Sequence, residues 1–115
     1  MKLEELLILL SENTFPFRAS RRPSPNSVIS TLAIDQIALV TPWFKIVFIY
    51  EYENREALEK DRMTLYKKFK KVYFDGEVVE IITRNIYIVT SKDKGERESK
   101  IEKQLRDICI NKGGN

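Results

Sequence analysis

The chain has 115 residues, of which 43% are hydrophobic and 32% charged, and its 20 Lys and Arg against 17 Asp and Glu give a net charge of +3. This balance is typical of one folded domain and excludes an intrinsically disordered chain. The chain contains one cysteine and no histidine, which excludes an internal disulfide, a Cys/His zinc site and any catalytic triad that needs an imidazole.

The N-terminal segment is apolar, but it does not have the pattern of a targeting signal. Leucines recur at spacings of three and four residues, which predicts a helix over residues 2–12. Glu4 and Glu5 precede the apolar run and no small-residue cleavage site follows it, so we do not expect a signal peptide. No run approaches the roughly 18 apolar residues of a membrane helix. We therefore expect a cytoplasmic protein without a membrane span.

Residues 15–27 interrupt the helical pattern. They contain three prolines, several serines and three arginines. Because proline fixes φ and lacks an N–H donor, we expect a loop or arm here. Residues 28–35 fit either a helix or irregular and strand-like chain, and a strand is expected at about 36–41.

The middle of the chain carries the clearest signals of secondary structure. Phe44–Glu53 alternates with a period of two and is rich in aromatic and β-branched residues, which predicts a strand. Asn54 can cap the helix that follows, because acidic residues fill its first turns and lysines its last. Leucine, phenylalanine and valine side chains at helical spacing supply the apolar stripe of this helix.

The last third of the chain predicts a hairpin and a helix. Asp75-Gly76 is a two-residue hairpin signal, and strands are expected over Val78–Thr83 and Ile86–Ser91, with a weaker turn between them. Gly95 separates the second strand from a final helix, and residues 111–115 are expected to be a frayed tail. The inward face of that helix is expected to be Ile101, Leu105, Ile108 and Cys109.

The order helix, strand, strand, helix, strand, strand, helix predicts the fold class. Such a chain forms a single α+β domain of two layers, in which helices pack on one face of an antiparallel sheet of about four to five strands. The whole chain, residues 1–115, is expected to be this one domain.

Two stretches carry a resemblance to a known family. Residues 36–61 read QIALVTPWFKIVFIYEYENREALEKD, and residues 81–105 read IITRNIYIVTSKDKGERESKIEKQL. This layout resembles the small α+β domain of certain bacterial lipoproteins and related proteins of uncharacterised function. The resemblance implies the same fold over most of residues 2–110. The chain has no lipobox cysteine, so an anchor is not carried over, and Ser91-Lys92-Asp93 replaces the family's second Gly-Asp signal. The family has no established active site, so no site residues are carried over either.

Two basic segments are candidate contacts for an anionic partner. A lysine run near the end of the second helix is interleaved with aromatic residues, a pattern that can neutralise phosphates and stack bases. The structural interpretation is that the lysines complement the helix dipole, while the arginine arm is a solubilising loop. The nucleic-acid hypothesis requires both segments on one face. The candidate contacts are Arg18, Arg21, Arg22, Lys67, Lys68, Lys70 and Lys71.

Other reactive side chains favour structural interpretations. Cys109 lacks a histidine to activate it, so we expect a buried thiol. Trp43 is either a core cap or an exposed anchor. Carboxylates near the strands can hold Mg²⁺, although an outward polar strand face explains them as well; these are Asp35, Glu51, Glu53 and Glu80. We predict no catalytic residue, no cofactor and no metal.

The sequence therefore predicts a non-enzymatic domain that acts by binding another protein or a second copy of itself. Residues 36–52 are apolar on both faces, so they must be covered on both sides by the chain's own helices or by a second subunit. The alternative is a nucleic-acid-binding protein that uses the two basic segments, and a third hypothesis is a hydrolase with a carboxylate-bound metal. No small-molecule ligand is implied.

Overall fold

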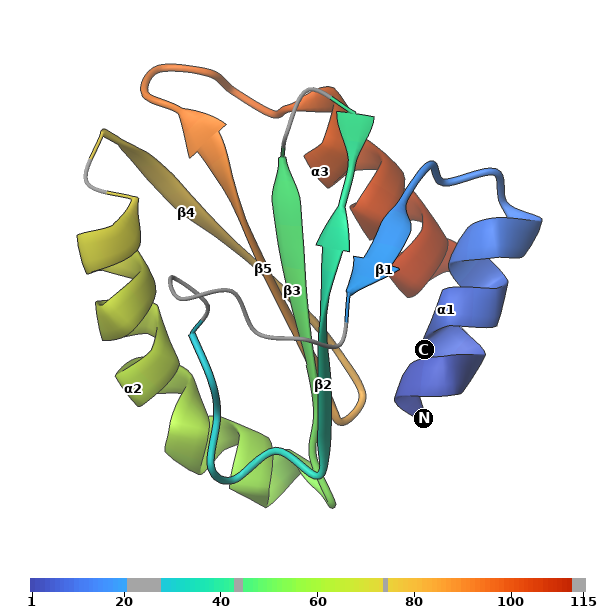
Figure 1. Ribbon diagram of the computed structural model, residues 1–115, viewed down its shortest axis with the longest axis vertical. Coiled ribbons are helices and arrows are strands. Elements are labelled where there is room, and N and C mark those ends of the chain that lie inside the picture. Colours follow the sequence, from blue (N-terminus) through green and yellow to red (C-terminus); the bar gives the residue numbers. More distant parts are fainter. Residues whose placement is uncertain (21–27, 43–44, 74, 113–115) are drawn as a thin grey trace.

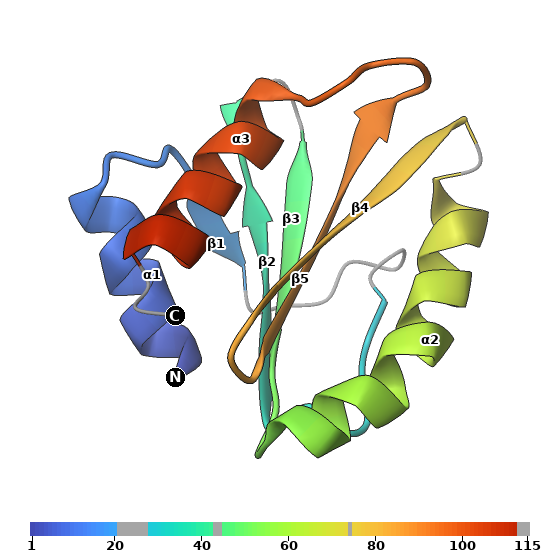
Figure 2. The same ribbon diagram turned by 180° about the vertical axis from the view of Figure 1, so that it is seen from behind.

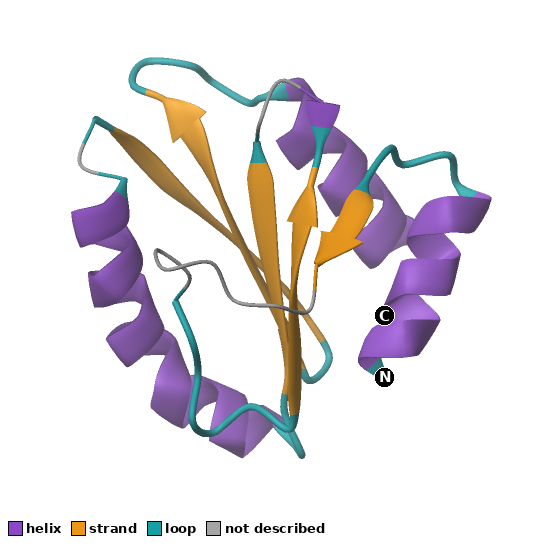
Figure 3. Ribbon diagram, viewed as in Figure 1, coloured by secondary structure: helices purple, strands orange, loops and turns teal. Residues whose placement is uncertain are grey.

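The computed structural model describes residues 1–20, 28–42, 45–73 and 75–112 (Figure 1). Figure 3 separates its helices, strands and loops by colour. In chain order the elements are α1 (Leu3–Glu12), β1 (Arg18–Ser20), β2 (Asp35–Val40), β3 (Ile46–Glu51), α2 (Arg55–Val72), β4 (Gly76–Thr83), β5 (Ile86–Asp93), α3 (Lys100–Arg106) and the π-helix η2 (Asp107–Lys112).

The strands form one open sheet in the order β1-β2-β3-β5-β4, and all pairings are antiparallel. Ile37 lies opposite Ile49, and Ile49 lies opposite Ile88, so a row of aliphatic side chains crosses the three central strands. Within the described residues, β1 and β4 are the two edges of the sheet. The predicted α+β class with an antiparallel sheet of about four to five strands is confirmed, and the sheet has five.

The helices divide between the two faces of the sheet. Figures 1 and 2 show α2 on one side of the strands and α1 and α3 on the other. Leu6 of α1 and Leu105 of α3 belong to one buried cluster with Ile49 of β3. Phe69 of α2 belongs to a second cluster, with Phe48 and Tyr50 of the same strand. The sequence pattern predicts helices on one face only. The difference follows from β3, because a strand that is apolar on both sides needs a cover on both.

Helix ends are fixed by side chains from other parts of the chain as well as by local caps. The Asn54 side chain accepts a hydrogen bond from the Ala57 N–H at the start of α2, at 2.9 Å, and Ser99 accepts from the Glu102 N–H at the start of α3, at 3.0 Å. At the start of α1 the buried Glu51 carboxylate accepts from the Leu3 N–H at 2.6 Å, so a strand residue supplies the anion that favours a helix N-terminus.

Three local predictions need correction. The segment predicted as an arm contains strand β1, which pairs with β2 at Arg18 opposite Val40. Asp75 and Gly76 connect α2 to β4 rather than two strands, and the Gly76 N–H donates to the Tyr73 carbonyl at 3.1 Å. The predicted tail begins inside η2. For β1 the pairing with β2, and not the local residue pattern, decided the backbone conformation.

Residues 28–34 lie outside regular elements in the structure and precede β2, which settles the ambiguity at 28–35 in favour of an irregular segment. The Ser30 hydroxyl donates to the Asp61 carboxylate of α2 at 2.5 Å, and Gln36 hydrogen bonds to both the N–H and the carbonyl of Ser30. This segment is therefore attached to the flank of α2. No helix in the described ranges combines the length and the apolar character needed to cross a membrane.

Candidate functional site

A pocket of about 440 Å³ lies between the C-terminal half of α2 and the first residues of β4. This volume is within the range of about 300–1,000 Å³ common for ligand sites. We call it the α2–β4 pocket, and its lining residues are Tyr66, Lys70, Tyr73, Gly76, Glu77, Val78 and Lys94.

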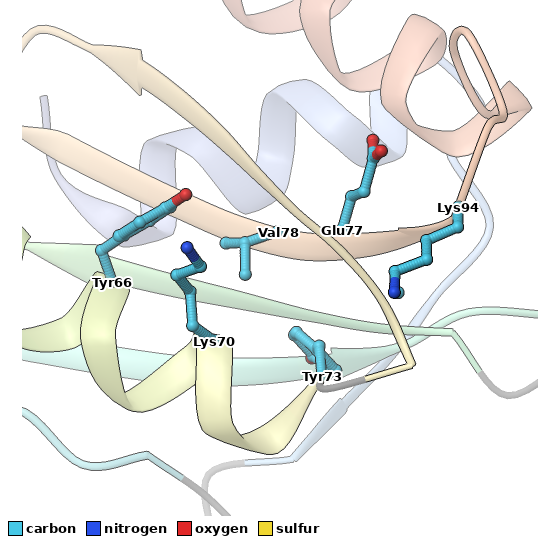
Figure 4. Close-up of a pocket in the computed structure, with 7 residues that line it drawn as sticks. Tyr66, Lys70, Tyr73, Glu77, Val78 and Lys94 are labelled. Atoms are coloured by element: carbon cyan, nitrogen blue, oxygen red, sulfur yellow. The ribbon is translucent and has the colours of Figure 1, made fainter.

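The position of α2 determines one wall of the α2–β4 pocket. Leu65 and Phe69 are buried on the inner side of the helix. Tyr66, Lys70 and Tyr73 follow one another at spacings of four and three residues, so they lie along one flank of the helix, beside its buried stripe. Figure 4 shows Tyr66 and Lys70 extending from α2 towards Val78 of β4.

The charged side chains at the α2–β4 pocket are not balanced. The Lys70 Nζ lies 5.6 Å from the centre of the Tyr66 ring, a cation–π contact. Lys94 reaches the pocket from the end of β5. Glu77 points away from Lys70 in Figure 4, and its carboxylate lies 3.7 Å from the Lys92 ammonium. Two lysines are thus left as the charged groups best placed to meet a ligand.

Tyr73 adds a rigid aromatic wall to the α2–β4 pocket. Its ring stacks on Phe69, with the ring centres 5.8 Å apart and an interplanar angle of 16°. Burial raises the pKa of Tyr73 from 10.0 to about 12. The phenol therefore stays neutral at physiological pH and keeps its hydroxyl as a hydrogen-bond donor.

Of the predicted basic residues, those that the structure describes lie on two separate elements, α2 and β1. Lys67, Lys68, Lys70 and Lys71 are all exposed on α2, where successive residues are rotated by about 100°, so the four spread over roughly 160° of the helix surface. Of these, Lys70 lines the α2–β4 pocket. Arg18 is exposed at the start of β1, at the opposite edge of the sheet from β4. Arg21 and Arg22 lie outside the described residues.

Lys94 is the site residue that sequence reasoning missed. It stands in a polar turn after β5, where a single lysine carries no signal. The antiparallel register brings it to the pocket, because Asp93 lies opposite Gly76 at the end of the β4–β5 ladder. The aromatic residues interleaved with the lysine run were the one signal in the sequence that pointed to this place.

The other described reactive candidates do not gather into a second site. Glu80 accepts hydrogen bonds from Arg62 and Tyr87, each at 2.8 Å. Asp35 hydrogen bonds to the Gln36 N–H, and Glu53 is exposed. Cys109 is fully buried, as predicted, and burial raises the pKa of its thiol from 9.0 to about 12. In the described part of the chain, no three His, Cys, Asp or Glu side chains converge as metal ligands. Trp43 lies outside it.

Comparisons with known proteins add no relative. No family model, no curated protein and no solved structure matches the chain.

Proposed function

We propose that this domain is a non-enzymatic binding module for another protein and that the α2–β4 pocket is its binding surface. One observation carries the proposal: the pocket joins an edge strand to a helix flank that presents aromatic rings and lysines. Edge strands and aromatic side chains are two recurrent means of binding peptide segments. Enzymatic roles have less support, because the Cys109 thiol is buried and Glu51 and Glu80 are engaged in hydrogen bonds.

A partner other than a second copy is favoured by the way the sheet is covered. Residues 36–52 led to the hypothesis of self-association, because both their faces are apolar. In the structure the two faces are packed against the chain's own helices, in two separate buried clusters. The apolar faces that suggested a homodimer are therefore covered within one chain.

The test is a selection of random linear peptides displayed on phage against the immobilised full chain. We expect enriched peptides whose binding to the purified protein falls at least about tenfold in a Tyr66→Ala variant. The matched control is Lys103→Ala, which truncates an exposed residue of α3 on the other face of the sheet. A selection without enriched peptides would contradict the proposal, and so would peptides that bind the Tyr66→Ala protein as tightly as the parent.

Nucleic-acid binding is a second candidate, favoured by the combination of Tyr66, Tyr73 and Lys70 in one pocket. Fluorescence anisotropy with labelled single- and double-stranded DNA and RNA tests it, at low and near-physiological salt. Binding that weakens linearly on a log-log salt plot and is lost when Tyr66 and Lys70 are replaced by alanine would favour this candidate. The absence of binding at low salt would dispose of it.

A further inference from the structure

We infer that the ligand of the α2–β4 pocket is an extended acidic peptide segment that adds to β4 as a further strand, with its carboxylate between Lys70 and Lys94. The inference rests on the proposed function and specifies the ligand and its binding mode. It joins three observations on β4: its open edge, the helix wall beside that edge, and the charge of the pocket.

The first observation is which backbone N–H and carbonyl groups of β4 point towards β5 and which point outwards. Thr83 and Ile86 flank a two-residue turn, and residues in this position form a hydrogen-bonded pair. Because hydrogen-bonded and non-hydrogen-bonded pairs alternate along an antiparallel ladder, the N–H and carbonyl of Val78 and Glu80 point away from β5. A contact of Arg106 agrees with this assignment, because its guanidinium donates to the outward-pointing Glu80 carbonyl at 3.4 Å.

The second observation is that one half of this edge is guarded, whereas among the described residues none hydrogen bonds to the outward-pointing backbone groups of Val78 in the other half. Arg106 occupies the Glu80 carbonyl, and charged side chains on an edge are a common defence against unwanted strand pairing. The α2–β4 pocket lies at Gly76, Glu77 and Val78. A ligand strand is therefore expected to pair with the beginning of β4, where the outward groups of Val78 are the central pairing site.

The third observation is the wall that α2 forms beside this half of β4. Val78 shares the face of the sheet that α2 covers. A strand paired with Val78 would direct every second side chain to the same face. There these side chains meet Tyr66 and Tyr73, which lie beside the open edge as Figure 4 shows. Main-chain hydrogen bonds supply affinity in this mode, and the pocket for alternate side chains supplies specificity.

Charge complementarity decides which side chain the α2–β4 pocket favours. Lys70 and Lys94 line it, whereas Glu77 is paired with Lys92. Asp75 and Asp93 are exposed at the Gly76 end of the strand, where they disfavour a second carboxylate. A single acidic residue in the middle of the ligand segment can approach Lys70 and Lys94 while it stays away from Asp75 and Asp93. A second copy of this chain fits less well, because pairing β4 with its symmetry mate would bring two copies of the lysine-rich end of α2 together.

The experiment uses fluorescein-labelled peptides and the full chain. The probe is Thr-Val-Thr-Val-Glu-Val-Thr-Val, and its matched control has Lys in place of Glu. We expect the acidic peptide to bind at least about tenfold tighter than the lysine peptide. A Lys70→Glu variant should reverse this preference, and Lys103→Glu on α3 should leave it unchanged. Amide hydrogen exchange should show protection of Val78 when the acidic peptide is added.

Each outcome has a separate meaning. Equal binding of the acidic and lysine peptides, or an unchanged preference in the Lys70→Glu variant, would overturn the carboxylate part. Binding without protection of Val78, or equal binding of a peptide N-methylated at alternate residues, would overturn strand addition.

If neither peptide binds but the phage selection yields ligands that depend on Tyr66, this inference fails while the proposed function stands. If the selection fails too, both fall. A concentration-dependent dimer that is lost on Lys70→Glu substitution would assign the edge to a second copy and overturn the inference.

Discussion

The two faces of the sheet are buried by different chemistry. The face under α1 and α3 is packed with leucine, isoleucine and valine, and its aromatic members are the buried Phe15 and the partly buried Phe17. The face under α2 is dominated by phenylalanine and tyrosine, and rings such as Phe48 and Phe69 approach to 5.0 Å between their centres. Aliphatic burial is non-directional, whereas aromatic rings pack in preferred orientations.

The aromatic face also contains polar groups that need partners. The hydroxyl of Tyr50 donates to the Val28 carbonyl at 2.6 Å, that of Tyr52 to Asp61 at 2.6 Å, and that of Tyr87 to Glu80 at 2.8 Å. Burying a hydroxyl without such a bond is costly. The aromatic face is thus specified by hydrogen bonds in addition to buried area, and it is the face on which α2 forms the wall of the α2–β4 pocket.

Truncating one core side chain on each face should have the largest effect. We expect Leu105→Ala to lower the free energy of unfolding by about 2–5 kcal/mol and Phe69→Ala by about 3–5 kcal/mol, because each leaves a cavity in a packed cluster. Chemical denaturation measures both. Met63→Ala is the control, since this side chain is 55% exposed and surface changes stay within about 0.5 kcal/mol. A loss below that size for Phe69→Ala would contradict the packing of α2 on the sheet.

Alkaline pH should weaken the aromatic face more than the aliphatic face. Burial raises the pKa values of Tyr50, Tyr52 and Tyr87 above the ordinary 10.0. The folded chain therefore keeps phenolic protons that the unfolded chain releases. Their contribution to stability is complete below about pH 10 and is lost as the pH rises towards the folded-state values, at about 1.4 kcal/mol per pH unit for each such proton.

Denaturant unfolding at a series of pH values measures this loss, with phenolate absorbance recorded on the same samples. The phenolate signal should appear together with unfolding. Phenolate that forms in the still-folded protein would show that the tyrosines are accessible. Cys109 on the aliphatic face causes a smaller loss of stability that begins at lower pH, because burial raises its thiol pKa from 9.0 to about 12. The Cys109→Ala variant should remove that smaller loss and leave the tyrosine-dependent loss.

Removing Asp61 should have an intermediate effect and tests whether hydrogen bonds specify the aromatic face. This carboxylate is 6% exposed and accepts the hydroxyls of Tyr52 and Ser30. Asp61→Ala leaves both hydroxyls without an acceptor, and we expect a loss of about 1–3 kcal/mol. Asp61→Asn keeps one acceptor oxygen and should lose less. If the two variants are equally destabilised in thermal melts, the acceptor oxygen that Asn keeps does not stabilise the aromatic face, which would contradict this prediction.

The smallest expected effects are at the helix caps, one on each face. Asn54→Ala at the start of α2 and Ser99→Ala at the start of α3 should each cost about 1 kcal/mol, because each removes the acceptor of a backbone N–H. Asn54→Asp and Ser99→Thr keep an acceptor and serve as controls. Since capping is local, the two losses should be similar, and a large inequality would mean that the two faces stabilise their helices differently.

Much of the secondary structure could be predicted from the sequence, because its signals are local. The alternation of β3, the Asn54 cap, and the inward row Ile101, Leu105, Ile108 and Cys109 depend only on side-chain period and nearby hydrogen bonds. Burial of Cys109 follows from the same row. Strand β1 is different: it is three residues long, and pairing with β2 creates it.

The tertiary structure alone decided which face each helix covers and where a site can form. The apolar pattern of α2 requires a partner surface but does not say which side of the sheet supplies it. The lysine run was visible in the sequence, yet only Lys70 among its members lines the α2–β4 pocket, and Lys94 joins it through the β4–β5 register. Periodicity encodes the orientation of a side chain about its own helix or strand, while contacts between residues far apart in the chain depend on how those elements pack.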